Sequence, residues 1–225
     1  MPKGSKHKAN QGVYEQFFDA IQANGFADDK TPAERAHQSP KQLAELMGLR
    51  LHAAASRGDA EACSRVLAEG ASAGYANFEG ATALMMAARE GHLKCVKVLL
   101  PHSDPQQKCL RGWSAMGWAA LEGHIPCLKA LLPTSNPSSL NYLGRTALAV
   151  AIQAGKVNVV ELLLPVTDLA IKDGLFGDVA KMARQHASNG VKFKAISTMV
   201  QRAVKEFNKK PSSPAPLGKP KPAAP

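Results

Sequence analysis

Hydrophobic residues in the middle of this chain fall into short blocks with helical spacing. One block is Leu84, Ala87 and Ala88, and the next is Val96, Leu99 and Leu100. Residues at positions i, i+3 and i+4 share one face of a helix, so the pattern predicts two short helices. Each would be shorter than about 12 residues, a length that is marginal in water on its own. Their stability must therefore come from packing against neighbouring helices.

Glycine and proline mark the ends of these helices. We expect Gly91 to end the first, because glycine adopts the left-handed cap without a steric penalty. Pro101 is expected to stop the second, because proline disfavours a helical conformation in the residue before it. Three polar pairs suited to turns follow the helix pairs: Ser103-Asp104, Ser135-Asn136 and Thr167-Asp168.

The same arrangement recurs along the chain at a nearly fixed interval. Windows starting at Gly80, Gly112 and Gly144 are spaced by 32 residues. An earlier copy starts at Leu51, which lies 33 residues before its counterpart Leu84. A period of this size is typical of stacked repeats, in which each unit buries its surface against its neighbours.

The repeated sequence resembles the ankyrin repeat, whose core reads Gly-x-Thr-Pro-Leu-His-x-Ala-Ala-x-x-Gly-His. The matching residues in one window are Thr82, Leu84, Ala87, Ala88, Gly91 and His92. Two departures are clear: alanine replaces the motif's proline at Ala83, Ala115 and Ala147, and Leu-Leu-Pro replaces the usual Leu-Leu-x-x-Gly ending in three repeats. The resemblance covers about residues 43–182. It implies an all-α solenoid of stacked helix-turn-helix units with helical N- and C-terminal caps.

The chain divides into a repeat array and two ends. We expect a disordered basic segment at 1–9, an N-terminal helical cap region at 10–42, the array at 43–184 with four clear repeats and a degenerate last one, a C-terminal helical cap at 185–207, and a disordered Pro/Lys-rich tail at 208–225. The apolar stripe around Phe17 and Phe18 is expected to cap the first repeat or to dock on a partner. The register of the last repeat stays open, because Gly174 and Gly177 compete for one role.

The net charge of +10 belongs to the ends of the chain. Residues 1–8 carry +3, residues 9–40 carry −3, residues 41–168 carry +2 and residues 169–225 carry +8. The basic ends are either solvated or make electrostatic contacts with nucleic acid or an acidic membrane.

No apolar run approaches the roughly 18 residues of a membrane span, and four cysteines make no disulfide framework. We expect a cytoplasmic monomer.

Catalytic and metal-binding motifs are few. His92 with Cys95, and His124 with Cys127, offer ligand types that zinc accepts. Equivalent positions in adjacent helical repeats lie about 10 Å apart, which is too far for one ion, so we expect no metal. Cys63 is one position out of register with this series, and Cys109 is expected to be the most exposed thiol. Without a phosphate-binding glycine loop or a nucleophile with its base, we predict no enzyme and no cofactor.

The remaining candidate is a surface for binding another protein. In the ankyrin pattern, turn tips and inner-helix faces form one concave strip, and here it carries Phe78, Glu79, Arg89, Arg111, Trp113, Trp118, Glu122, Tyr142, Leu143 and Arg145. Tryptophan, tyrosine and arginine are common interface hot spots. Trp113 is expected to be exposed at a tip, whereas Trp118 either packs between repeats or joins the surface. We predict a non-enzymatic scaffold or adaptor; the alternative is a nucleic-acid- or membrane-associated protein anchored by its basic C-terminal segment.

Overall fold

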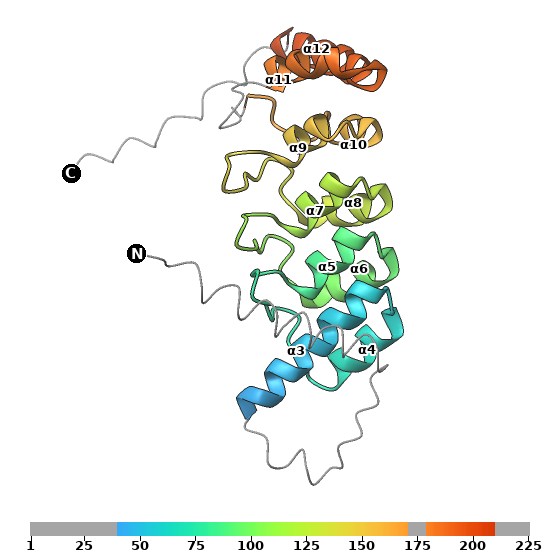
Figure 1. Cartoon of the computed structure of the whole chain (residues 1–225), viewed down its shortest axis with the longest axis vertical. Coiled ribbons are helices and arrows are strands. Elements are labelled where there is room, and N and C mark those ends of the chain that lie inside the picture. Colours follow the sequence, from blue (N-terminus) through green and yellow to red (C-terminus); the bar gives the residue numbers. More distant parts are fainter. Residues whose placement is uncertain (1–39, 171–178, 210–225) are drawn as a thin grey trace, which may run out of the picture.

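The computed structural model describes residues 40–170 and 179–209, which form a stack of helix pairs (Figure 1). The α-helices are α3 (Pro40–Arg57), α4 (Ala60–Ala68), α5 (Ala83–Glu90), α6 (Leu93–Leu99), α7 (Ala115–Glu122), α8 (Ile125–Leu131), α9 (Ala147–Gln153), α10 (Val157–Leu163), α11 (Val179–His186) and α12 (Val191–Lys209). Odd-numbered inner helices pack on one another, even-numbered outer helices lie beside them, and the linking loops project to one side. Within these residues there is no strand, only an isolated bridge between Ala76 and Thr82. The all-α fold is confirmed.

Local interactions set both ends of the inner helices, and the end at Gly91 was predicted from the sequence. The side chains of Thr82, Ser114 and Thr146 each accept a hydrogen bond from the backbone N–H three residues on, at the start of α5, α7 and α9. Gly91 ends α5 in the left-handed conformation, with φ of 80°. A side chain there would be strained, which explains glycine at this position.

Two outer helices end before their proline, as predicted for Pro101, and a 3-10 turn follows each of them. Helix α6 ends at Leu99, but the chain continues as a 3-10 helix, η1 (Leu100–His102), that includes Pro101. The second case is η2 (Leu132–Thr134), which includes Pro133. Proline is tolerated in a first turn because its missing N–H has no partner to lose there. The α-helix therefore stops before the proline and the chain tightens around it.

Small side chains let the inner helices approach one another closely. Ala87 and Ala88 of α5, and Ala119 and Ala120 of α7, are all completely buried. Leucines from both helices of each pair, such as Leu84 and Leu99, fill the remaining space at 0–1% exposure. The core is thus a continuous layer along the stack, as expected when each repeat buries its surface on its neighbours.

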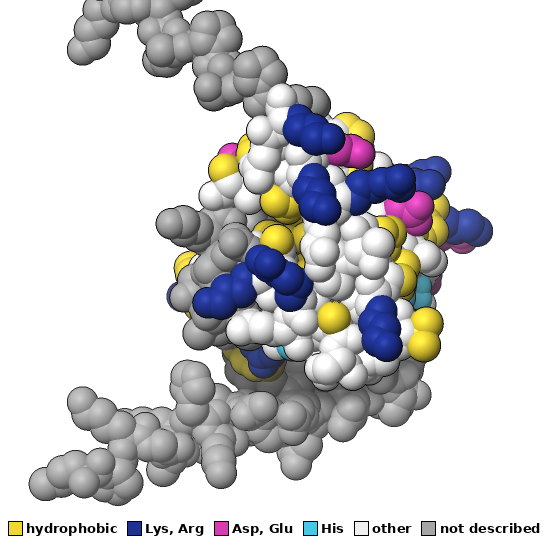
Figure 2. Space-filling view, turned by 90° about the horizontal axis from the view of Figure 1, so that it is seen from above, with side chains coloured by type: hydrophobic (Ala, Val, Ile, Leu, Met, Phe, Trp, Pro, Cys, Tyr) yellow, Lys and Arg dark blue, Asp and Glu magenta, His cyan; other side chains and the backbone are white. Residues whose placement is uncertain are grey.

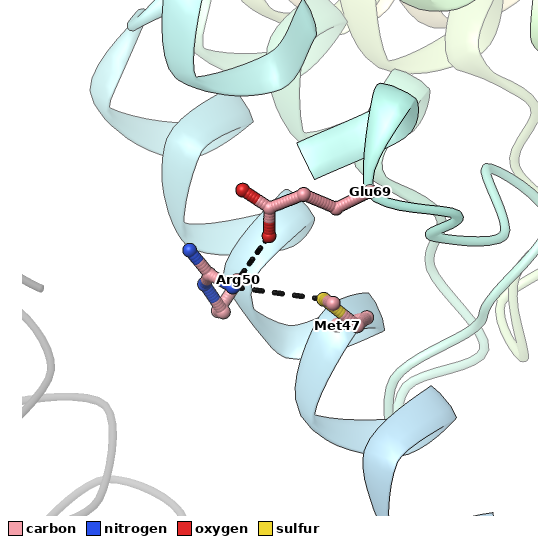
Figure 3. A network of polar contacts seen from close by, with 3 residues as sticks. All are labelled: Met47, Arg50 and Glu69. Carbon is pink, nitrogen blue, oxygen red and sulfur yellow. Dashed lines mark hydrogen bonds and ion pairs between the residues drawn. The ribbon is translucent and has the colours of Figure 1, made fainter. Parts of the chain in front are cut away.

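The N-terminal end of the stack is a single long helix paired with α4. Helix α3 runs through the predicted boundary between residues 42 and 43. Arg50 of α3 donates a hydrogen bond of 2.8 Å to Glu69 at the end of α4, and also approaches the Met47 sulfur (Figure 3). The predicted helix around Phe17 and Phe18 lies outside the described residues.

The C-terminal end continues the stack. The buried side chains of α11 show the register that the glycines left open, because they lie 32 residues after buried side chains of α9: Val179, Met182 and Ala183 follow Ala147, Val150 and Ala151. Helix α12 contacts α10 and α11, which puts it in the place of an outer helix. Its end at Lys209 includes two residues assigned to the tail on sequence grounds; residues 210–225 lie outside the described part.

Candidate interaction surface

Two of the loops between helix pairs are tight hairpins, each held by an asparagine side chain. Asn77 accepts hydrogen bonds from the backbone N–H groups of Glu79 and Ala81 at 3.0 and 2.9 Å. Asn141 accepts the equivalent pair from Leu143 and Arg145, both at 2.9 Å. These local bonds fix the loop conformation, and each tip therefore presents its side chains from a preformed turn.

Backbone hydrogen bonds tie neighbouring hairpins together. The N–H of Leu110 donates to the carbonyl of Glu79 at 2.8 Å, and the N–H of Tyr142 donates to that of Arg111 at 3.5 Å. An ion pair of 3.8 Å also joins Arg111 and Glu79. Three consecutive hairpins are thereby aligned along one edge of the stack.

Large apolar side chains are exposed at these aligned tips. The exposed fractions are 54% for Phe78, 67% for Leu110, 71% for Tyr142 and 58% for Leu143. We call the row formed by Phe78, Glu79, Leu110, Arg111, Tyr142 and Leu143 the tip strip. Apolar side chains are normally buried, so a contiguous exposed row is a feature of binding surfaces.

The two tryptophans lie beneath this strip. Trp113 was expected to be exposed, but its side chain is half-buried because its ring packs on Gly117. A Cβ atom at Gly117 would lie 2.7 Å from Cε3 of the indole. Trp118 is 8% exposed, 6.4 Å from Trp113 between ring centroids, and the Arg89 guanidinium lies 5.1 Å from its ring centroid. Trp118 thus packs in the stack, with Arg89 as a cation–π partner.

Polar side chains of the inner helices border the strip. Glu90, Glu122 and Gln153 are exposed on successive inner helices. Arg145 donates a hydrogen bond to Gln153, which links a hairpin to the inner helix of the same repeat. Of the residues chosen from the sequence, the structure brings together the tip residues and leaves Arg89 and Glu122 on the helices beside them.

The histidines of the turns have structural contacts. Nε2 of His92 lies 3.0 Å from the carbonyl of Ser56, and a Cβ atom at Gly58 would lie 2.6 Å from its Nδ1. His124 occupies the same place over Gly91, where a Cβ atom would lie 2.5 Å from Nδ1. Each ring fills a gap over the turn glycine of the preceding repeat. Within the described residues, no group of three or more potential metal ligands occurs.

One expectation about cysteine was wrong. Cys109 is 2% exposed, because it stands at the base of a hairpin in the place of Asn77 and Asn141. Helix α4 packs on α6, so Cys63 lies near Cys95 although it is one position out of register with it. When one repeat stacks on the next, the upper face of one unit packs on the lower face of its neighbour. Residues at different positions within the repeat can therefore lie next to each other. Burial, the largest cause, and the neighbouring Cys95 raise the pKa of Cys63 to about 12.

A family comparison agrees with this geometry. The model for ankyrin repeats (3 copies) matches residues 51–139 and 102–173, which together span more than half of the chain. The chain belongs to the ankyrin repeat family. Ankyrin repeats are generally protein-binding modules and usually non-catalytic. A comparison with curated proteins gave no match.

The ankyrin pattern found the tips but missed the residues that shape them. Gly117 was not singled out, although Trp113 and Gly117 stand where the preceding repeat has Ala81 and Met85. The signal in the sequence was that one repeat has a small residue followed by a large one, whereas the next has a large residue followed by a small one.

No helix in the described part of the chain has the length and apolar character of a membrane span.

Proposed function

We propose that this chain is a non-enzymatic scaffold or adaptor that binds another protein through the tip strip and the adjoining inner-helix residues. The observation that carries the proposal is the exposure of Phe78, Leu110 and Tyr142 on hairpins joined by backbone hydrogen bonds. Exposed aromatic side chains on a firm support provide contact area with few rotatable bonds. The chain is expected to act as a monomer.

Rigidity supports this proposal. The Asn77 and Asn141 bonds fix individual loops, and the bonds from Leu110 and Tyr142 fix each loop on its neighbour. Association then requires little ordering of backbone, so more of the contact energy appears as affinity. Arg111 and Arg145 beside the apolar tips favour a partner with acidic side chains around an apolar centre.

The test replaces the most exposed tip residues and follows one identified partner. Proteins captured on the immobilised full chain are identified by mass spectrometry, and the affinity of the purified candidate is measured by calorimetry. We expect Tyr142→Ala with Leu143→Ala to weaken binding at least tenfold, since hot-spot truncations cost about 2 kcal/mol or more.

The control is Val166→Ala, which removes an apolar side chain of 48% exposure that does not belong to the tip strip. It should leave the affinity unchanged. Trp113→Ala is a poorer test, because it would also empty the space above Gly117. If the tip variant binds as tightly as the control, the partner uses another surface and the proposal is wrong.

A further inference from the structure

The last helix pair carries most of the net positive charge of the described residues. Residues 179–209 contain seven Lys or Arg and one acidic residue, whereas residues 41–168 contain twelve and ten. All seven basic side chains are exposed, and we call them the end face: Lys181, Arg184, Lys192, Lys194, Arg202, Lys205 and Lys209. Figure 2, which looks onto this end of the stack, shows Lys and Arg side chains spread over it with fewer acidic ones.

Packing of α12 directs its positive charges outward. Ile196 and Val200 are completely buried against the stack, so the opposite side of the helix faces solvent. Lys194, Arg202 and Lys205 project within one 80° arc of that side, at 100° per residue. From Lys194 to Lys209 this row extends about 22 Å at 1.5 Å per residue.

We propose that the end face binds the phosphate backbone of double-helical nucleic acid. A duplex presents about one negative charge per 1.7 Å of its axis, so a straight row of cations of this length can meet several phosphates at once. The row is held on a packed helix, which spares the ordering cost that a flexible basic segment would meet.

The side chains around the row argue against other polyanions. Single-strand binders stack bases on aromatic side chains, and the solvent side of α12 around Lys194, Arg202 and Lys205 has none. Helices that lie on membranes insert an apolar face, but that of α12 is buried in the stack. Its exposed large apolar residues are Val191 and Phe207, near opposite ends of the helix. Non-specific binding to a duplex, in contrast, is supplied essentially by charge contacts with its phosphates.

The test neutralises the row in the full chain and measures binding to a 20-base-pair DNA duplex by fluorescence anisotropy. Lys194→Gln, Arg202→Gln and Lys205→Gln together are expected to weaken binding at least tenfold at low salt. The slope of log K against log salt should become shallower by up to about 2.7, which corresponds to three lost phosphate contacts. Circular dichroism checks that the variant is folded.

Two variants with the same loss of charge serve as controls. One carries glutamine at the exposed outer-helix residues Lys94, Lys97 and Lys129, and the other at the tail residues Lys210, Lys219 and Lys221. We expect both to retain binding within about threefold. If either control loses as much as the end-face variant, the effect belongs to total charge or to the tail, and the proposal is wrong.

A membrane arm completes the test. Phosphatidylserine vesicles are titrated into the protein–duplex complex, and we expect the duplex to stay bound. If the vesicles bind the chain while the duplex does not, the end face is a membrane-facing surface and the proposal fails. The Tyr142→Ala, Leu143→Ala variant should bind duplex normally, which separates this proposal from that for the tip strip.

Discussion

The indole of Trp113 occupies the space above Gly117 that a side chain would fill. A Cβ atom at Gly117 would lie 2.7 Å from the ring, closer than such atoms approach in proteins. The preceding repeat has Ala81 and Met85 at these two positions, so the large side chain has moved from the helix to the hairpin. The hairpin of the third repeat therefore depends on a glycine that lies inside α7.

Gly117→Ala should destabilise the protein although alanine is the better helix former. The helical gain is at most about 1 kcal/mol, whereas forcing a side chain into filled space costs about 1–3 kcal/mol. We expect a net loss of about 1–2 kcal/mol in the free energy of unfolding, measured by urea titration with circular dichroism. In a Trp113→Ala background the same substitution should become neutral or stabilising.

Gly74→Ala is the matched control for this prediction. A Cβ atom at Gly74 would meet only the Ser72 hydroxyl, at 3.7 Å, so its effect should stay within about 0.5 kcal/mol. A stabilising Gly117→Ala substitution in the wild-type background would contradict the packing of Trp113 described here.

Cys109→Asn should stabilise the protein. The asparagines at the equivalent positions each accept two backbone hydrogen bonds, and a thiol is only a weak acceptor. With about 0.5–1.5 kcal/mol for each bond, a gain of about 1–2 kcal/mol in the free energy of unfolding is expected by urea titration. The reverse substitution, Asn141→Cys, should lower it by a similar amount. If both substitutions raised the free energy of unfolding, or both lowered it, the two hairpins would not be equivalent and the prediction would be wrong.

Stability should fall as the pH drops below about 6.5, because of His52. Its side chain is 2% exposed, and burial lowers its pKa against the opposing effect of the hydrogen bond with the Tyr75 carbonyl. The unfolded chain, with an ordinary histidine pKa of about 6.5, then binds the extra proton first. The contribution is therefore present above that pH and is lost in acid.

The measurement for His52 is the melting temperature between pH 7.5 and pH 5.5. The wild type should lose stability over this range, and His52→Gln should lose less because glutamine does not titrate. The exposed His102→Gln is the control and should behave as the wild type. Equal pH dependence in all three proteins would exclude His52 as the cause.

The thiols should resist alkylation in the folded protein. All four cysteines are buried, and the pKa of Cys63 is raised to about 12, which leaves a thiolate fraction of about 10⁻⁴ at pH 8. Burial also raises the pKa of Cys95 and of Cys127. Iodoacetamide at pH 8 should label none of them within minutes in buffer and all of them in urea, as counted by mass spectrometry.

Ser64→Cys provides the positive control, because Ser64 is exposed on the same helix as Cys63. This variant should gain one label in buffer. Rapid labelling of Cys109 in the wild type would mean that its hairpin opens, and would support the exposure first expected from the sequence.

The sequence by itself determined the helix pairs, their period and their ends. These features depend on local chemistry: the face spacing of Leu84, Ala87 and Ala88, and the left-handed glycine at Gly91. Each acts within about one helical turn, so it can be read without knowing what packs on it. The register of the last repeat stayed open on the sequence alone, because Gly174 and Gly177 fit the same role.

Only the tertiary structure decided which side chains are exposed. Trp113 is covered because Gly117 leaves room for it, and Cys63 lies near Cys95 although their positions in the repeat differ. Tyr142 stays 71% exposed although its backbone is bonded to the neighbouring hairpin and its ring lies against Gly112. These outcomes depend on contacts between opposite faces of successive repeats. The hydrophobic pattern within one repeat does not specify which side chains of the next repeat pack against it.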